Sequence, residues 1–240
     1  MRRRFFADSV DGNQAWVEGA NAAHLARVLR AQVGQQYELA FAGRAYLAQV
    51  VAVQKDRVGF DLIEELPPPP PSAGIELNAA VFKFDRLEWM LEKATELGVS
   101  RIQLVAAERS EPKLVAAAEK RLPRWRQIMF DAAQQSRRAE LPELLPPCGL
   151  AAVLARPFPG RSLLLSEDPE TTTMLAPGQP STRLLAGPEG GFTGAESAAA
   201  QAACWQPVSL GPRILRCETA ALAALARLIV PTRAGRGFCR

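Results

Sequence analysis

The pattern of hydrophobic and polar positions is most regular between residues 75 and 107. Mostly apolar runs at 75–82 and 101–107 predict two buried strands. Residues 85–97 lie between them and have the apolar spacing of an amphipathic helix. The apolar face of this helix comprises Leu87, Met90, Leu91, Ala94 and Leu97. A helical crossover of this length predicts that the two strands run parallel in a β-α-β unit.

The ends of the helices also carry signals. Asp85 and Glu88 are expected to cap the helix at 85–97, and Gly98 to end it. A second apolar period predicts a helix at 120–138, and Pro123 places its start near residue 120 because proline is tolerated in a first turn. Its inward positions are expected to be Leu122, Trp125, Met129, Ala132 and Ala133, with Arg121, Arg124 and Arg126 largely outward.

The rest of this half alternates strands and helices in the same way. Buried strands are predicted at 163–167 and 183–186, a shorter one ends at Val208, and a helix is predicted at 220–230. The alternation indicates an α/β fold with a parallel sheet.

The amino-terminal part has a different pattern. Strand-like segments at 36–42, 44–53 and 57–63, separated by turns, predict a small β-barrel. A short helix is expected at 22–29, with Leu25, Val28 and Leu29 on its apolar face. The five prolines at 67–71 form an extended spacer, which divides the chain into domains at 1–70 and 74–240.

Composition narrows the class of protein. The 240 residues are 48% hydrophobic and 22% charged, as in ordinary soluble proteins, and the net charge of +4 weakly favours an acidic partner such as RNA. No apolar stretch reaches the roughly 18 residues that span a bilayer, and an acidic residue at position 8 interrupts any signal peptide. The cysteines, at 148, 204, 217 and 239, lack metal-binding spacing, so we expect no metal and a cytoplasmic protein with free thiols.

Two glycine-rich loops each follow a strand and precede a helix. The first contains Gly187, Gly190 and Gly191, which let the main chain approach a ligand closely, and then a capping box formed by Thr193 and Glu196. The second lies at 209–216. Neither loop has the spacing of a P-loop or of a dinucleotide-binding fingerprint. Loops at the carboxyl ends of parallel strands predict opposite walls of one pocket.

These loops carry a family resemblance. The segment Gly-Pro-Glu-Gly-Gly at 187–191, followed by Leu-Gly-Pro-Arg-Ile-Leu-Arg-Cys-Glu-Thr-Ala at 210–220, resembles the paired signature of bacterial 16S ribosomal RNA uracil-N3 methyltransferases. Residues 93–99, 108–110 and 131–138 also resemble elements of that family, although Gln134 stands where glutamate is usual. The family belongs to the SPOUT superfamily. The resemblance implies an α/β fold with a trefoil-knotted parallel sheet domain, preceded by a small PUA-like RNA-binding β-barrel.

The resemblance also implies a cofactor and its contacts. S-adenosylmethionine would lie in a cleft formed by three loops of the knotted domain, and the family dimerises through that domain, so a homodimer is expected. The implied cofactor contacts are Leu165, Ser166, Gly187, Pro188, Glu189, Gly190, Gly191, Leu210, Gly211, Pro212, Ile214 and Leu215.

The same resemblance suggests how 16S ribosomal RNA would be bound. It places an RNA-binding barrel at the amino terminus, where arginine forks suit phosphate oxygens. The candidate RNA contacts are Arg2, Arg3, Arg4, His24, Arg27 and Arg30, together with Lys83 and Arg109 at the carboxyl edge of the sheet. For each of these residues a solvated surface charge is an open alternative.

Catalytic roles follow from the chemistry of methyl transfer to a uracil nitrogen. The ring loses a proton, and negative charge spreads onto its carbonyl oxygens, where a fixed guanidinium stabilises it. Arg216, beside the second glycine loop, is our candidate for that guanidinium. Glu218 or Glu189 could accept the proton, and either could instead cap a helix.

Three alternative functions stay open. A SPOUT enzyme that acts on transfer RNA is the nearest to the first interpretation. A non-catalytic RNA-binding protein is the second, and absence of S-adenosylmethionine binding would favour it. A nucleotide-dependent enzyme is the third and lacks any phosphate motif.

Overall fold

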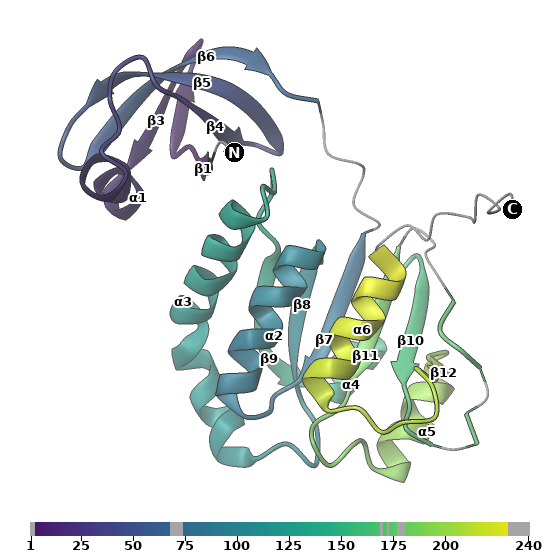
Figure 1. The fold of residues 1–240 in the computed structure, drawn as a ribbon. Helices are drawn as coiled ribbons and strands as arrows, with labels where there is room; N and C mark the ends of the chain where they lie inside the picture. The colour runs from purple at the N-terminus through teal and green to yellow at the C-terminus, as the bar shows by residue number, and fades with distance from the viewer. Residues whose placement is uncertain (1–2, 68–73, 169, 172, 177–180, 230–240) are drawn as a thin grey trace, which may run out of the picture. The chain divides into compact units, whose positions relative to one another are not determined.

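The computed structural model describes residues 3–67, 74–168, 170–171, 173–176 and 181–229 (Figure 1). The chain divides into two compact units. Unit 1 comprises residues 1–71 together with 130–141, and unit 2 comprises 72–129 and 142–240. None of the helices in the described ranges is long and apolar enough to cross a membrane.

Unit 1 is built on a curled six-stranded sheet with the order β1-β4-β5-β6-β3-β2. Its strands are β1 (Arg4–Phe6), β2 (Ser9–Asp11), β3 (Gln14–Glu18), β4 (Gln36–Phe41), β5 (Arg44–Val53) and β6 (Arg57–Glu65). Ala7 donates a backbone hydrogen bond to Ala40 after β1, and the next residue, Asp8, donates one to Trp16 on β3. Because these two bonds reach opposite sides of the sheet, the amino-terminal segment bridges its edges. The sheet thereby takes the barrel-like curvature that the sequence predicts.

A short helical segment follows β3. Helix α1 (Gly19–Ala23) passes directly into a π-helical turn, η1 (His24–Val28). Leu25 is fully buried in a core with Val17, Leu39 and Phe60, as expected. Val28, however, is 66% exposed, so its predicted place on the apolar face is wrong. The π-helical turn holds more residues than an α-helical one and rotates position 28 away from the core.

Unit 2 contains a six-stranded sheet with the order β12-β10-β11-β7-β8-β9, and all its pairs are parallel. Its strands are β7 (Ile75–Ala80), β8 (Arg101–Ala106), β9 (Glu143–Gly149), β10 (Arg161–Leu165), β11 (Thr182–Ala186) and β12 (Gln206–Val208). Every residue of β7 and β11 is buried, because a parallel sheet is covered on both faces. The predicted α/β fold is therefore confirmed.

Helices cover the two faces of this sheet. They are α2 (Phe84–Leu97), α3 (Pro112–Gln135), α4 (Leu150–Ala155), α5 (Gly194–Ala202) and α6 (Cys217–Ile229). Leu163 and Leu184 pack on one face with residues of α2, α3 and α6. The next residues, Leu164 and Leu185, point to the other face and pack with residues of α4 and α5. Figure 1 shows α2 and α6 side by side over the first face.

Two predictions about helix ends are wrong. The N-cap of α2 is Lys83, with no side-chain cap, and Glu88 instead pairs with Arg124 of α3 at 2.8 Å. Helix α3 begins at Pro112, so Pro123 lies inside the helix and not in its first turn. Proline is favoured at the first position of a helix, and in α3 that position is occupied by Pro112. The inward residues predicted for α3 are buried, and the predicted outward arginines are exposed.

The strand order defines where a ligand should bind. From β7 the chain continues to β8 and β9 on one side, and then returns to build β11, β10 and β12 on the other. The order therefore reverses between β7 and β11. In open parallel sheets ligands bind outside the carboxyl ends of the strands at such a switch point. The predicted glycine loops follow β11 and β12 at this edge.

Candidate active site

Three loops leave neighbouring strands at the carboxyl edge of unit 2 and contact one another. The loop after β10 begins with Ser166, whose backbone N–H donates to the Val208 carbonyl at the end of β12 (3.0 Å). Farther along the same loop, Leu175 donates to the Ser209 carbonyl at 3.1 Å. The loops after β10 and β12 thus run side by side. These bonds place the predicted cofactor residues Leu165 and Ser166 beside the start of the loop that carries the other predicted contacts Leu210, Gly211, Pro212, Ile214 and Leu215.

The loop after β11 contains the Gly-Pro-Glu-Gly-Gly segment and is tightly turned. The Gly191 N–H donates to the Pro188 carbonyl at 2.9 Å, and Gly191 has a φ of +68°, which favours glycine. A Cβ atom on Gly191 would lie 2.7 Å from Oε1 of Glu167 in the loop after β10. The absence of a side chain therefore allows these two loops to approach closely.

Residues that follow β8 anchor the same loop. Arg109 Nη1 donates to the Gly190 carbonyl at 2.7 Å. The predicted capping box of α5 is present, and Glu196 Oε1 also accepts a bond from the Glu108 backbone N–H at 2.8 Å. Thr193 Oγ1 donates to Glu108 Oε2 at 3.2 Å. Arg109, a candidate RNA contact, thus holds the glycine loop in place.

The loop after β12 exposes apolar surface. Gly211 adopts a φ of +126°, and its N–H donates to Ser209 Oγ at 3.2 Å, which fixes the turn. Ile214 is 80% exposed, while Leu215 is half-buried. An exposed isoleucine between the turn at Gly211 and the start of α6 is a suitable surface for an apolar part of a ligand. Arg216 follows it, exposed, immediately before α6.

A charged cluster joins this loop to the loop after β11. Arg86 of α2 lies between two carboxylates, with Nε 3.9 Å from Glu218 Oε1 and Nη1 4.0 Å from Glu189 Oε1. Glu218 is only 6% exposed, and the Cys217 thiol donates to its Oε2 at 3.3 Å. The two glutamates considered as proton acceptors therefore share one cation. Sequence reasoning missed Arg86, because its position on the exposed side of a helix gives no signal of this pairing.

The Cys217 thiol is held in its neutral form. Burial and the hydrogen bond to the Glu218 carboxylate raise the pKa of Cys217 to about 12. At neutral pH the thiol is therefore a hydrogen-bond donor to Glu218 and a poor nucleophile. Glu218 lies in the first turn of α6, where negative charge is stabilised by the helix dipole.

The candidate RNA contacts of unit 1 fall into two groups. Arg3, His24, Arg27 and Arg30 are exposed. Arg4 is not available in the same way, because its Nε and Nη2 donate to Glu38 Oε2 at 3.1 and 2.8 Å and its Nη1 donates to the Arg137 carbonyl. This geometry disfavours a phosphate contact for Arg4. Arg2 lies outside the described residues, and Lys83 is exposed near the carboxyl end of β7.

The site offers no metal ligands among the residues that the structure describes. No group of three or more histidine, cysteine, aspartate and glutamate side chains gathers there in a way that could hold an ion. Cys148, Cys204 and Cys217 are free thiols.

Comparison with known sequences gives a consistent family. The sequence model of the RNA methyltransferase domain matches residues 69–229. Ribosomal RNA small subunit methyltransferase E of Bacillus subtilis is 31% identical over 239 residues, covering 92% of this chain and 91% of that protein. The protein of the same name from Mycobacterium tuberculosis is 32% identical over 240 residues, covering 95% and 91%.

Solved structures agree with this result. Ribosomal RNA small subunit methyltransferase E of Neisseria gonorrhoeae, bound to S-adenosylmethionine, superposes with a TM-score of 0.80 at 31% identity, covering 94% of this chain and 96% of that one. A Legionella pneumophila methyltransferase in complex with the same cofactor gives a TM-score of 0.83 at 28% identity, with the same coverage. The described fold, with its curled sheet and its parallel sheet, is therefore that of the SPOUT-type relatives. The chain belongs to the RNA methyltransferase domain family and, within it, to the ribosomal RNA small subunit methyltransferases E.

Proposed function

We propose that this protein transfers the methyl group of S-adenosylmethionine to N3 of a uracil in 16S ribosomal RNA of the small subunit. The observation that carries the proposal is the contact among the three loops at the switch point of the sheet, which contain the paired glycine signature. Family membership supports the reaction class, because full-length relatives are named as small subunit ribosomal RNA methyltransferases.

The residues present fit the cofactor. The glycines of the loop after β11 leave its main-chain groups open to a ligand. A Cβ atom placed on Gly190 would lie 3.4 Å from the Arg109 side chain, an ordinary van der Waals contact, so the loop is closely packed without a clash. Exposed Ile214 and half-buried Leu215 suit an apolar part of the molecule, such as the adenine ring. When bound, S-adenosylmethionine supplies an electrophilic methyl group on a sulfonium.

Arg216 is the residue that we assign to the uracil. It is exposed, and no ion pair or side-chain hydrogen bond engages it among the described residues. Its guanidinium is therefore available to a substrate carbonyl oxygen as negative charge develops on the ring. A cation would repel the sulfonium, so this arginine suits the nucleophile better than the cofactor.

Glu218 is our choice of proton acceptor over Glu189. Glu218 is buried, with a thiol donor on one oxygen and Arg86 near the other, and its orientation is therefore fixed. Glu189 is exposed and contacts the same arginine only at 4.0 Å. General base catalysis requires such a fixed position.

For RNA binding we propose the exposed residues Arg3, His24, Arg27 and Arg30 of unit 1 and Lys83 of unit 2. Arg27 lies in η1, and Arg30 follows two residues after the end of that turn, so the two charges are close in sequence. Phosphate contacts of this kind give affinity and register without reading sequence. The ribosome is a cytoplasmic particle, and we propose that location for the protein.

We further propose that the protein is a homodimer through the face formed by α2 and α6. A groove of about 570 Å³ between these helices is lined mainly by apolar atoms of Trp89, Leu97, Leu222, Ala223 and Ala226. Trp89 is 47% exposed there, an unusual place for so large an apolar side chain. Trp89→Glu should give a monomer in light scattering, whereas an unchanged mass would exclude this face.

The direct experiment is methylation of small ribosomal subunits that lack the modification, followed by mapping of the product. Transfer of labelled methyl from S-adenosylmethionine to N3 of uracil in 16S RNA is expected. Transfer to transfer RNA in place of 16S RNA would favour the alternative SPOUT substrate. RNA binding without detectable binding of S-adenosylmethionine would favour a non-catalytic protein.

A further inference from the structure

A second cavity lies at the opposite edge of the unit 2 sheet from the three loops. Its volume is about 480 Å³, and Arg161, Ser162, Arg183 and Gln206 on its wall belong to the first residues of β10, β11 and β12. The loops described above follow the other ends of these strands. The cavity is therefore separate from the site proposed for S-adenosylmethionine.

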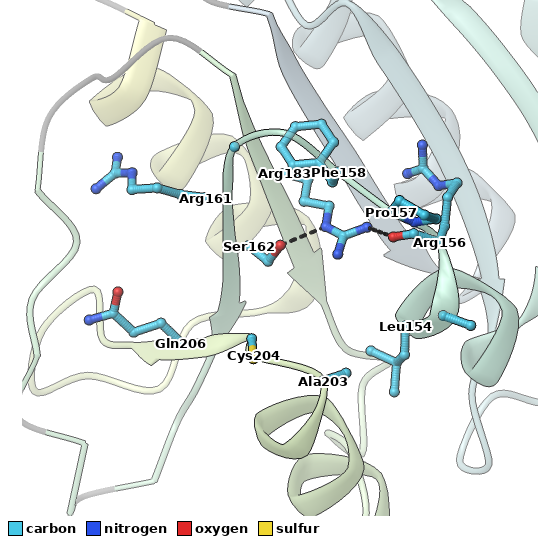
Figure 2. Close-up of a pocket in the computed structure, with 12 residues that line it drawn as sticks. Leu154, Arg156, Pro157, Phe158, Arg161, Ser162, Arg183, Ala203, Cys204 and Gln206 are labelled. Carbon is cyan, nitrogen blue, oxygen red and sulfur yellow. Dashed lines mark hydrogen bonds between the residues drawn. The ribbon is translucent and has the colours of Figure 1, made fainter.

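Arg183 dominates this cavity. Arg183 is only 4% exposed. Its Nε donates to Ser162 Oγ and its Nη1 donates to the Arg156 carbonyl, both at 2.7 Å (Figure 2). The guanidinium lies against two aromatic rings, 4.4 Å from the centroid of Trp205 and 5.1 Å from that of Phe158. Its orientation is thus fixed by two neutral acceptors and by cation–π contacts.

The third nitrogen of this guanidinium is unused. Within the described ranges, Nη2 makes no hydrogen bond, and Figure 2 shows the guanidinium facing the hollow between Ser162, Cys204 and Leu154. The indole Nε1 of the adjacent Trp205 is buried and also lacks an acceptor in the part of the chain that the structure describes. Buried hydrogen-bond donors are ordinarily paired with an acceptor, so the cavity beside Arg183 and Trp205 lacks acceptor atoms for these two donors.

The cavity also lacks a negative charge. A chain of ion pairs runs beside it, in which Arg156 and Arg101 share Glu76 and Arg101 also binds Glu143 at 2.7 Å. The two positive and two negative charges of this chain cancel, whereas Arg183 has no carboxylate partner among the described residues. Burial lowers the pKa of Arg183, and the nearby Arg156 cation lowers it further. An unpaired buried cation is costly unless an anion joins it.

We propose that this cavity binds a small molecule through an oxyanion, a carboxylate or a phosphate, that pairs with Nη2 of Arg183. The volume of about 480 Å³ exceeds that of a lone ion and lies within the range of small-molecule sites. Ser162 Oγ accepts the Arg183 bond, so its own hydrogen is free to donate to the same oxyanion. Gln206 lies on the wall as an additional polar group.

The test uses Cys204, an exposed thiol on the cavity wall, as a reporter in the full-length protein. Alkylation of Cys204 is followed by mass spectrometry in sodium acetate, sodium phosphate or uridine 5′-monophosphate, against sodium chloride of equal ionic strength. Cys239 serves as the internal reference for general effects on reactivity. We expect one or more of the oxyanions to slow alkylation at least about tenfold, the scale of one charge-assisted contact.

The salt that protects Cys204 identifies the kind of oxyanion that the cavity binds. Protection by acetate alone indicates a carboxylate ligand, and stronger protection by phosphate or by the nucleotide indicates a phosphate ligand. Equal alkylation rates in all four salts overturn the proposal, and this measurement on the unaltered protein does not depend on any variant folding.

Two variants locate the contact. Arg183→Met removes the charge at similar length and should abolish protection. Arg124→Met is the matched control, because Arg124 pairs with Glu88 and does not line the cavity. Arg161 is unsuitable as a control, because its buried Nε and Nη2 also lack a partner among the described residues. Binding of S-adenosylmethionine should be unchanged in both variants, which separates this site from the proposed active site. Protection that persists in folded Arg183→Met, or that disappears in Arg124→Met, contradicts the assignment.

Discussion

Arg86 of α2 and Glu218 of α6 face each other with 3.9 Å between Nε and Oε1, and the glutamate is almost completely buried. The same arginine reaches Glu189 in the loop after β11. A single cation therefore links the first turn of the last described helix to the glycine loop. We infer that Arg86 is a positioning residue, which keeps the proposed base and the proposed cofactor loop in a fixed relation.

Loss of this cation should reduce turnover. Arg86→Met leaves the buried Glu218 carboxylate without its positive neighbour, and we expect kcat to fall by about tenfold or more. Arg86→Lys keeps the charge and should restore most of the activity. Arg124→Met is the matched control. Arg124 of α3 pairs with Glu88, which lies on α2 as Arg86 does, and the substitution should leave kcat unchanged. Equal turnover in Arg86→Met and Arg124→Met would contradict the positioning role.

Arg216 should act on the transition state. Arg216→Ala should lower kcat by roughly a hundredfold or more, the scale of losing one oxyanion donor, while calorimetry shows little change in cofactor affinity. Arg213→Ala tests whether any exposed arginine of this loop has the same effect, and we expect it to be far milder. The assignment is wrong if Arg216→Ala loses cofactor binding and turnover in parallel.

Gly190 should be required for the cofactor and dispensable for the fold. A Cβ at this position would make ordinary contact with the Arg109 side chain at 3.4 Å, and the backbone needs no left-handed conformation. Gly190→Val should therefore keep its thermal unfolding temperature within a few degrees and lose S-adenosylmethionine binding in calorimetry. Gly194→Ala, where a Cβ would have no neighbour within 4 Å, should keep binding. Full affinity in Gly190→Val would exclude this loop from the pocket.

RNA affinity should depend on salt through a defined set of arginines. Replacing Arg3, Arg27 and Arg30 by alanine should reduce the slope of log K against log salt by up to about two to three, since each phosphate contact contributes somewhat less than one. Arg44→Ala is the control, because that exposed arginine already pairs with Glu65. Arg4→Ala should instead destabilise unit 1, by about 2 kcal/mol, because Glu38 loses the charged hydrogen bonds from Arg4 and keeps its pairing with Arg137. An unchanged slope in the triple variant would place the RNA surface elsewhere.

Stability should fall in alkaline solution because of Cys217. The folded protein keeps this thiol protonated up to a pKa of about 12, whereas the unfolded chain releases the proton near pH 9. Between these two pH values the unfolded state therefore binds fewer protons than the folded state. The free energy of unfolding then falls as the pH rises. Urea unfolding at pH 8 and pH 10.5 should show a loss that Cys217→Ala reduces. A loss of the same size in the variant would mean that other groups cause it.

The sequence predicts this fold well where local signals decide it. The apolar runs at β7, β8 and β11 lie within two residues of the predicted bounds, and the capping box of Thr193 and Glu196 forms as expected. Helix α4 and strand β9 were missed, because each is short and β9 contains two prolines.

Pairings between distant charges are the part that could not be predicted. Nothing in the spacing indicates that Arg86 meets Glu218, or that Arg4 is committed to Glu38. Both contacts depend on how whole elements pack, and periodicity reports only which face of one element is buried. The glycine signature located the candidate site, while the residues that brace it, Arg86 and Glu108, emerge only from the tertiary structure.

The order of strands in unit 2 has a consequence for the synthesis of the chain. β7 is complete at residue 80, but its partner β11 begins at residue 182, and Asn78 on β7 donates to the Leu184 carbonyl across 106 positions of sequence. Contacts this distant close slowly, and an unpaired apolar strand can associate with other chains. While the ribosome makes the intervening hundred or so residues, the nascent protein must therefore carry an unsatisfied edge on what becomes an inner strand of its sheet.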